Sequence, residues 1–182
     1  MKLQIDGKQR PPTVENNTMN DVQIQRAKTS DLEIVIQLTR DTFGQVSIES
    51  NIESEFGLIN GTSWQDRKAD HIRDDFNDPD GRVLLATKDK QTIGFVSIRL
   101  HRKSKIGVIA NLAVVATERN SGVGRMLIQA ALDEMKRESM ELARIETLEQ
   151  NDVGQTLYPK LGFGEIARQI YYCQDLGDEN NV

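Results

Sequence analysis

Apolar positions recur along the chain at two spacings, one typical of strands and one typical of helices. Alternation over residues 22–27 predicts a strand. Apolar residues three or four apart over about 32–43 predict a helix, and Ser30 and Glu33 before it have the spacing of a capping box. A similar pattern over 66–77 predicts a second helix, after another cap-type serine.

The rest of the chain alternates between the two patterns, separated by Gly- and Pro-rich turns. We expect strands at 83–87, 93–100 and 106–115, a helix at 123–135, a short strand at 144–148, a helix at 152–161 and one or two strands within 163–175. Helices interleaved with strands in this order predict an α/β or α+β fold built on a mixed sheet.

The N-terminal segment differs from the remainder because it shows no apolar period. Residues 1–21 are polar, with Pro11 and Pro12, and are predicted to be a flexible arm before a single domain at 22–182. No stretch has the ~20 apolar residues of a membrane span. The arm also lacks the apolar core of a signal peptide, so we expect a cytoplasmic protein that does not bind membranes.

Charge and cysteine content remove several classes of protein. The formal net charge is −5, which argues against a chain that coats nucleic acid. Cys173 is the single cysteine, so no intramolecular disulfide can form. Two histidines and one cysteine argue against a zinc site, and no metal is expected.

The turn between the predicted strand at 106–115 and the next helix carries the clearest chemistry. It reads Arg-Asn-Ser-Gly-Val-Gly-Arg over residues 119–125. The first amides of a helix have no internal partners, and the helix dipole adds positive potential there. With Arg119 and Arg125 at its ends, the turn is predicted to bind a pyrophosphate-like anion. It lacks the third glycine of a dinucleotide fingerprint and the Gly-Lys-Ser/Thr of a triphosphate loop.

Two ordered motifs resemble the GNAT superfamily of N-acetyltransferases. R-x-x-G-x-G at 119–124 follows a strand that ends in Leu-Ala-Val, as in the family's acetyl-coenzyme A signature. Residues 151–163 resemble the family's N-x-x-A-x-x-L-Y-x-K-x-G-F segment, with Gly154 where alanine is usual. The resemblance covers about 22–175 and implies a mostly antiparallel sheet of six or seven strands flanked by about four helices. The second motif is nearest to the ribosomal-protein-alanine acetyltransferases.

The resemblance implies acetyl-CoA as co-substrate and assigns residues to it. The backbone of the strand would pair with the pantetheine arm, the turn would hold the pyrophosphate, and one asparagine would contact the cofactor from the next helix. These residues are Leu112, Ala113, Val114, Arg119, Asn120, Ser121, Gly122, Val123, Gly124, Arg125 and Asn151. Asn151 also stands where a helix N-cap is expected, and both roles are compatible.

Two catalytic residues are implied, with different support. Tyr158 would protonate the leaving thiolate, because a phenol with a pKa of about 10 can donate to it; the alternative is a packing tyrosine. Glu146 would accept the amine proton, directly or through water, with Glu149 as a second candidate and a solvated surface residue as the alternative. The strand before the turn, where many family members have a carboxylate, has none at 109–112.

The predicted function is therefore transfer of an acetyl group from acetyl-CoA to a primary amine by direct attack in a ternary complex. The acceptor, an amine-bearing small molecule or a protein, would lie against the segment 43–81, where the family recruits its substrates. The alternative is a catalytically silent acyl-CoA-binding regulatory module of the same fold. A homodimer is usual for the family.

Overall fold

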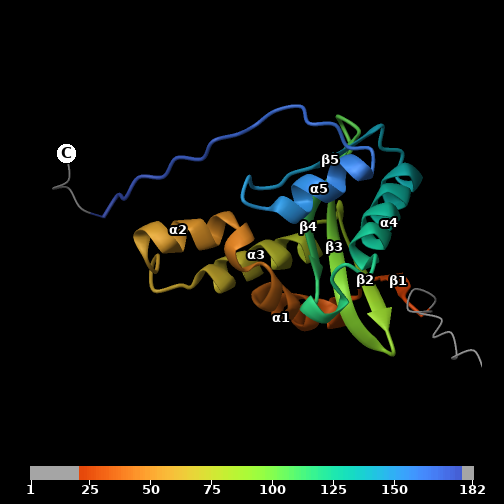
Figure 1. The fold of residues 1–182 in the computed structure, drawn as a ribbon, viewed down its shortest axis with the longest axis horizontal. Coiled ribbons are helices and arrows are strands. Elements are labelled where there is room, and N and C mark those ends of the chain that lie inside the picture. The colour runs from red at the N-terminus through yellow and green to blue at the C-terminus, as the bar shows by residue number, and fades with distance from the viewer. Residues whose placement is uncertain (1–20, 178–182) are drawn as a thin grey trace, which may run out of the picture.

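The computed structural model describes residues 21–177 as five strands and five α-helices with three short 3₁₀ turns (Figure 1). In chain order they are β1 (Gln23–Arg26), α1 (Leu32–Thr42), α2 (Ile48–Phe56), α3 (Trp64–Asn77), β2 (Gly81–Lys88), β3 (Gln91–His101), β4 (Ile106–Val114), α4 (Val123–Arg137), β5 (Leu142–Ile145) and α5 (Asp152–Lys160). The predicted arm at 1–21 lies, apart from its last residue, outside the described residues.

The five strands form one sheet in the order β1-β2-β3-β4-β5. Neighbours are antiparallel except β4 and β5, which are parallel. This confirms the mixed, mostly antiparallel sheet. The described residues contain five strands rather than six or seven, because residues 163–177 follow an extended path without joining the sheet (Figure 1).

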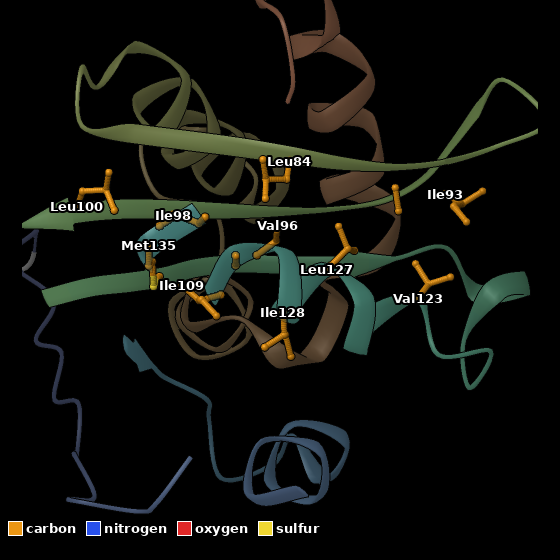
Figure 2. Packing of buried hydrophobic residues seen from close by; sticks show 12 residues of the cluster. Leu84, Ile93, Val96, Ile98, Leu100, Ile109, Val123, Leu127, Ile128 and Met135 are labelled. Carbon is orange, nitrogen blue, oxygen red and sulfur yellow. The ribbon is translucent and has the colours of Figure 1, made fainter. Parts of the chain in front are cut away.

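Helices cover both faces of the sheet and bury a separate apolar cluster on each. α4 packs on one face through Val123, Leu127, Ile128 and Met135 against strand residues such as Val96 (Figure 2). α1 and α3 pack on the other face through Val35, Ile36, Ala69 and Ile72 against Leu85 and Phe95. Alternate residues of the central strands therefore point into different clusters, as a two-sided sheet requires.

The helix starts confirm one predicted cap and correct another. Ser63 Oγ accepts a hydrogen bond from the Asp66 amide at 3.2 Å and begins α3. The capping box predicted for Ser30 is wrong, because a 3₁₀ turn at Thr29–Asp31 takes up this stretch. There the Asp31 carboxylate accepts from the Lys28 amide at 2.8 Å.

α2 was not predicted, although it begins with a serine cap. Ser47 Oγ accepts from the Ser50 amide at 3.1 Å. The apolar residues of α2, Ile48, Ile52 and Phe56, are spaced four apart, but none is buried. Among residues 21–177, no helix is long and apolar enough to cross a membrane.

Candidate functional site

Strand β4 is paired on both sides only over its first half. Its parallel pairing with β5 ends at Ile109 opposite Ile145. Its antiparallel pairing with β3 continues to Val114, after an irregularity in register between Ser97 and Ile98. Beyond Ile109, the β4 edge that faces away from β3 therefore has no partner strand among residues 21–177.

Backbone groups of Leu112 and Val114 face this unpaired edge. The Val115 amide donates to the Ile93 carbonyl of the β3 side at 2.9 Å. The N–H and C=O of one strand residue point to the same side, and this side alternates from residue to residue, so those of Leu112 and Val114 point away from β3. The edge can thus accept an extended ligand as an added strand.

The turn after β4 leaves the start of α4 open. Gly122 is the N-cap residue, with φ of 93°, and no side chain caps the helix. The positive φ favours glycine at this position. α4 is also the one α-helix of the described residues without an acidic residue in its first turn. Its first amides are therefore free to donate to an anion.

Charges around the turn favour an anionic ligand. Arg119 and Arg125 are exposed, and neither has an acidic partner among residues 21–177. Glu118, the nearest acid in sequence, is paired with Lys88 at 2.9 Å, and this hydrogen bond raises the pKa of the Lys88 ammonium. The negative charge of Glu118 is thereby offset beside the turn.

The remaining turn residues differ in what they can offer to a ligand. Val123 is buried in the core under α4, so its backbone alone is available. Ser121 Oγ donates to the Glu118 carbonyl at 2.6 Å, and Asn120 is exposed with φ of 62°. A Cβ at Gly124 would meet the side chains of Leu157 and Val114 at 3.9 and 4.0 Å, which is ordinary van der Waals contact without a clash.

Tyr158 lies on α5 and packs against the α4-side core. Its ring meets Phe163 edge-on, with the centroids 6.3 Å apart. The hydroxyl has no hydrogen-bond partner among the described residues. Burial raises the pKa of this phenol above its ordinary value, so the group stays protonated at neutral pH.

Asn151 is confirmed as the N-cap of α5. Its Oδ1 accepts from the Gly154 amide at 3.2 Å. A Cβ at Gly154 would stand 2.7 Å from Thr147 Oγ1 and 2.9 Å from Asn151 Nδ2. A side chain at position 154 would therefore require Thr147 or Asn151 to shift.

The two candidate bases are exposed and paired with arginines. Glu146 follows β5 directly and lies 3.1 Å from Arg144. Glu149 lies 3.2 Å from Arg168 of the C-terminal segment. Both carboxylates are exposed, and neither is hydrogen-bonded to Tyr158 among the described residues, so the choice between them stays a prediction.

A family model decides the classification. The model of the acetyltransferase (GNAT) family matches residues 47–163, more than half of the chain. The chain belongs to the GNAT family. The matched range includes the β4 edge, the turn at the start of α4 and Tyr158.

Curated relatives and solved structures of GNAT proteins agree with this assignment. N-alpha-acetyltransferase 30 of Saccharomyces cerevisiae is 34% identical over 79 residues, 43% of this chain and 45% of that protein. The chain therefore spans less than half the length of this relative. Aminoglycoside N-acetyltransferase AAC(6')-Iy, in complex with the bisubstrate analog CoA-S-monomethyl-acetylneamine, has a TM-score of 0.62 at 18% identity. That match covers 85% of this chain and 98% of that one.

A further neighbour is the ribosomal-protein-S18-alanine N-acetyltransferase from Escherichia coli. It has a TM-score of 0.63 at 18% identity and covers 84% of each chain. At these identities the two solved structures support the fold, and they leave the substrate of this GNAT protein open.

One buried acid near the site was missed by the sequence reasoning. Asp75 of α3 is 1% exposed and contacts side chains of β3 and β4. A signal existed, because Asp75 follows Ala69 and Ile72 on the apolar face of α3. A charged residue at such a position is buried only when it is paired.

On the same helix, burial lowers the pKa of Lys68, whose Nζ lies 4.7 Å from the centre of the Phe43 ring.

Proposed function

We propose that the protein transfers the acetyl group of acetyl-CoA to a primary amine by direct attack within a ternary complex. The observation that carries this proposal is the uncapped, acid-free start of α4 at the end of a half-paired strand. Membership of the GNAT family supports the same reaction class.

The residues present fit the co-substrate. The unpaired peptide groups of Leu112 and Val114, with Ala113 between them, would hold the pantetheine arm as an added strand. The amides from Arg119 to Arg125 would hold the pyrophosphate, with the two arginines supplying charge. Gly124 has no side chain, which would let the phosphates approach the backbone closely. Asn151 would contact the co-substrate through Nδ2, because its Oδ1 caps α5.

Two groups of the chain would move protons. Bound acetyl-CoA supplies a thioester that an amine can attack. Tyr158 would donate its proton to the leaving sulfur, since its raised pKa keeps it protonated and its hydroxyl has no competing partner among the described residues. Glu146, directly or through water, would take the proton of the attacking amine, and Glu149 is the second candidate.

The acceptor is a primary amine on a small molecule or a protein. The relatives described above are named as acetyltransferases of different acceptors, an aminoglycoside in one case and a ribosomal protein in another. We therefore treat neamine and a peptide with a free N-terminus as the first two acceptors to test.

Release of free coenzyme A thiol from acetyl-CoA is the direct test. We expect turnover that depends on the acceptor, no burst of thiol without it, and no acetyl group on the protein itself. Tight binding of coenzyme A by calorimetry with no turnover across a broad amine panel would contradict the proposed reaction. It would favour a silent binding module instead.

The proposal includes a homodimer formed through residues 163–177. This segment is extended and pairs with no strand among the described residues, and Ile166, Ile170 and Tyr172 are 86%, 73% and 87% exposed. β5, at one end of the sheet order, offers an edge on which such a segment can add. We expect a dimer by light scattering and a monomer for Ile170→Lys. A wild-type monomer at all concentrations would contradict the dimer.

A further inference from the structure

A buried polar cluster lies on the sheet face opposite α4. It consists of Asp75 of α3, Ser97 and Arg99 of β3 and Asn111 of β4. The Asp75 carboxylate accepts from Ser97 Oγ at 2.6 Å, from Asn111 Nδ2 at 2.7 Å and from Arg99 Nε at 2.5 Å. The Asp75 side chain is fully buried, whereas that of Arg99 is 41% exposed. The carboxylate is thus satisfied by three donors from two strands.

Asp75 determines which way the Asn111 amide points. A carboxylate can only accept hydrogen bonds, so the amide must present its Nδ2 to Asp75 and its Oδ1 to the opposite side. Nδ2 also donates to Ser97 Oγ at 3.0 Å. Asn111 Oδ1 is consequently left buried without a hydrogen-bond partner among the described residues. A buried acceptor without a partner is unfavourable until a donor reaches it.

The position of this oxygen connects it to the proposed reaction. Asn111 is 3% exposed and immediately precedes Leu112, where the unpaired β4 edge would hold the pantetheine arm. The preceding residue, Ala110, has no partner on β3, because Ser97 pairs with Asn111 and Ile98 pairs with Ile109. The same stretch of strand has no carboxylate of its own.

We propose that Asn111 Oδ1 accepts a hydrogen bond from the N–H of the acceptor amine and that Asp75 is the positioning residue that aims it. This inference rests on the proposed function and names a substrate-binding residue for it. The β4 edge without a partner strand is the side from which the donor would enter. Binding would then satisfy the oxygen that has no hydrogen-bond partner among residues 21–177. The neutral amide takes no proton, so the base remains a separate group.

Asn111→Leu is the primary test, with Ser97→Ala as the matched control. Both variants remove one donor to the Asp75 carboxylate, so both should lower the thermal midpoint. Only the first removes Oδ1. With neamine or the peptide as acceptor, we expect Asn111→Leu to raise the acceptor KM by about 10- to 100-fold. Ser97→Ala should leave that KM nearly unchanged, and both should keep the wild-type affinity for coenzyme A. Equal KM effects in the two variants, or no KM effect in Asn111→Leu, would overturn the inference.

An exchange of the two side chains guards against loss of folding. Asp75→Asn/Asn111→Asp keeps a donor and an acceptor facing each other and returns an oxygen to the position of Asn111 Oδ1. We expect the double variant to recover stability relative to either single change and to recover acceptor KM relative to Asn111→Leu. A stable double variant that keeps the KM of Asn111→Leu would refute the role of this oxygen.

A second readout separates this inference from the proposed function. In ¹⁵N spectra, the side-chain amide signals of Asn111 are identified by their absence in Asn111→Leu. We expect them to shift when the peptide or neamine is added to the coenzyme A-bound protein. If the wild type acetylates neither probe, the reaction proposal fails for these acceptors. Unshifted Asn111 signals at saturating probe would reject the inference even where turnover is observed.

Discussion

Two strand-to-helix junctions stand side by side in this sheet, and they are built in opposite ways. β4 leads into α4 and the parallel β5 leads into α5. The start of α5 is closed, because Asn151 caps the Gly154 amide and Asp152 lies in the first turn. The start of α4 has neither a side-chain cap nor an acid.

The contrast separates positioning from binding. A closed start satisfies its own amides and fixes α5, which carries Tyr158 on its inner side. An open start leaves amides for a ligand at a small loss of stability, because glycine instead of a capping side chain costs about a few tenths of a kcal/mol. The same element pair can thus serve as a support in one place and as an anion site in the other.

Tyr158→Phe should give the largest change, and it tests the closed junction. We expect kcat to fall by about 10²–10⁴-fold, because the variant cannot protonate the leaving thiolate. Stability and coenzyme A affinity should change little, since the hydroxyl has no partner among residues 21–177. Tyr172→Phe, which removes the hydroxyl of an 87% exposed ring, is the control and should be silent.

The pH dependence of kcat gives the same assignment a second test. Burial raises the pKa of Tyr158 above the ordinary 10.0. The protonated acid is the active form, so activity should be retained below that value and lost only as pH rises through the raised pKa. An alkaline limb well below pH 10 that disappears in Tyr158→Phe would show that the direction of the shift is wrong.

Gly122→Asp should close the open junction. A carboxylate at the N-cap can accept from the first amides of α4 and would face the incoming pyrophosphate. We expect calorimetry to show about a 100-fold loss of coenzyme A affinity, or ~2.7 kcal/mol. Gly61→Asp is matched in residue type, charge and positive φ (68°) but stands away from the turn, so it should bind normally. Equal losses in both variants would point to general strain instead.

The open junction was predictable from sequence, because Arg119, Gly122 and Gly124 specify a turn by backbone conformation and charge. The contacts that assemble Asp75 with Asn111 were not, since these residues are 36 positions apart and meet only across the sheet. The strand expected within 163–175 failed for a similar reason. Alternation predicts a strand, but a strand forms only by pairing with a neighbouring edge, and in this structure the segment pairs with none of the described strands.

Alanine at Gly124 and at Gly154 should separate the two junctions further. A Cβ at Gly154 would clash with Thr147 and Asn151, so we expect a loss of about 1–3 kcal/mol in urea unfolding. A Cβ at Gly124 would make ordinary contacts, and alanine favours the helix, so stability should hold or rise by about 0.5–1 kcal/mol. Coenzyme A affinity should fall in Gly124→Ala, about tenfold. The reverse pattern would contradict the contrast between the crowded Gly154 and the uncrowded Gly124.

The smallest effect tests the cap of α5 itself. Asn151→Ala removes the side chain that accepts from the Gly154 amide, so we expect unfolding to become easier by about 1 kcal/mol. Asn151→Asp keeps an acceptor at the cap while removing Nδ2, and should retain the stability. If Asn151 also contacts the co-substrate through Nδ2, both variants should weaken coenzyme A binding although only one is destabilised. Normal binding in Asn151→Asp would restrict this residue to the cap, and would leave the open junction of α4 and the β4 edge as the cofactor site.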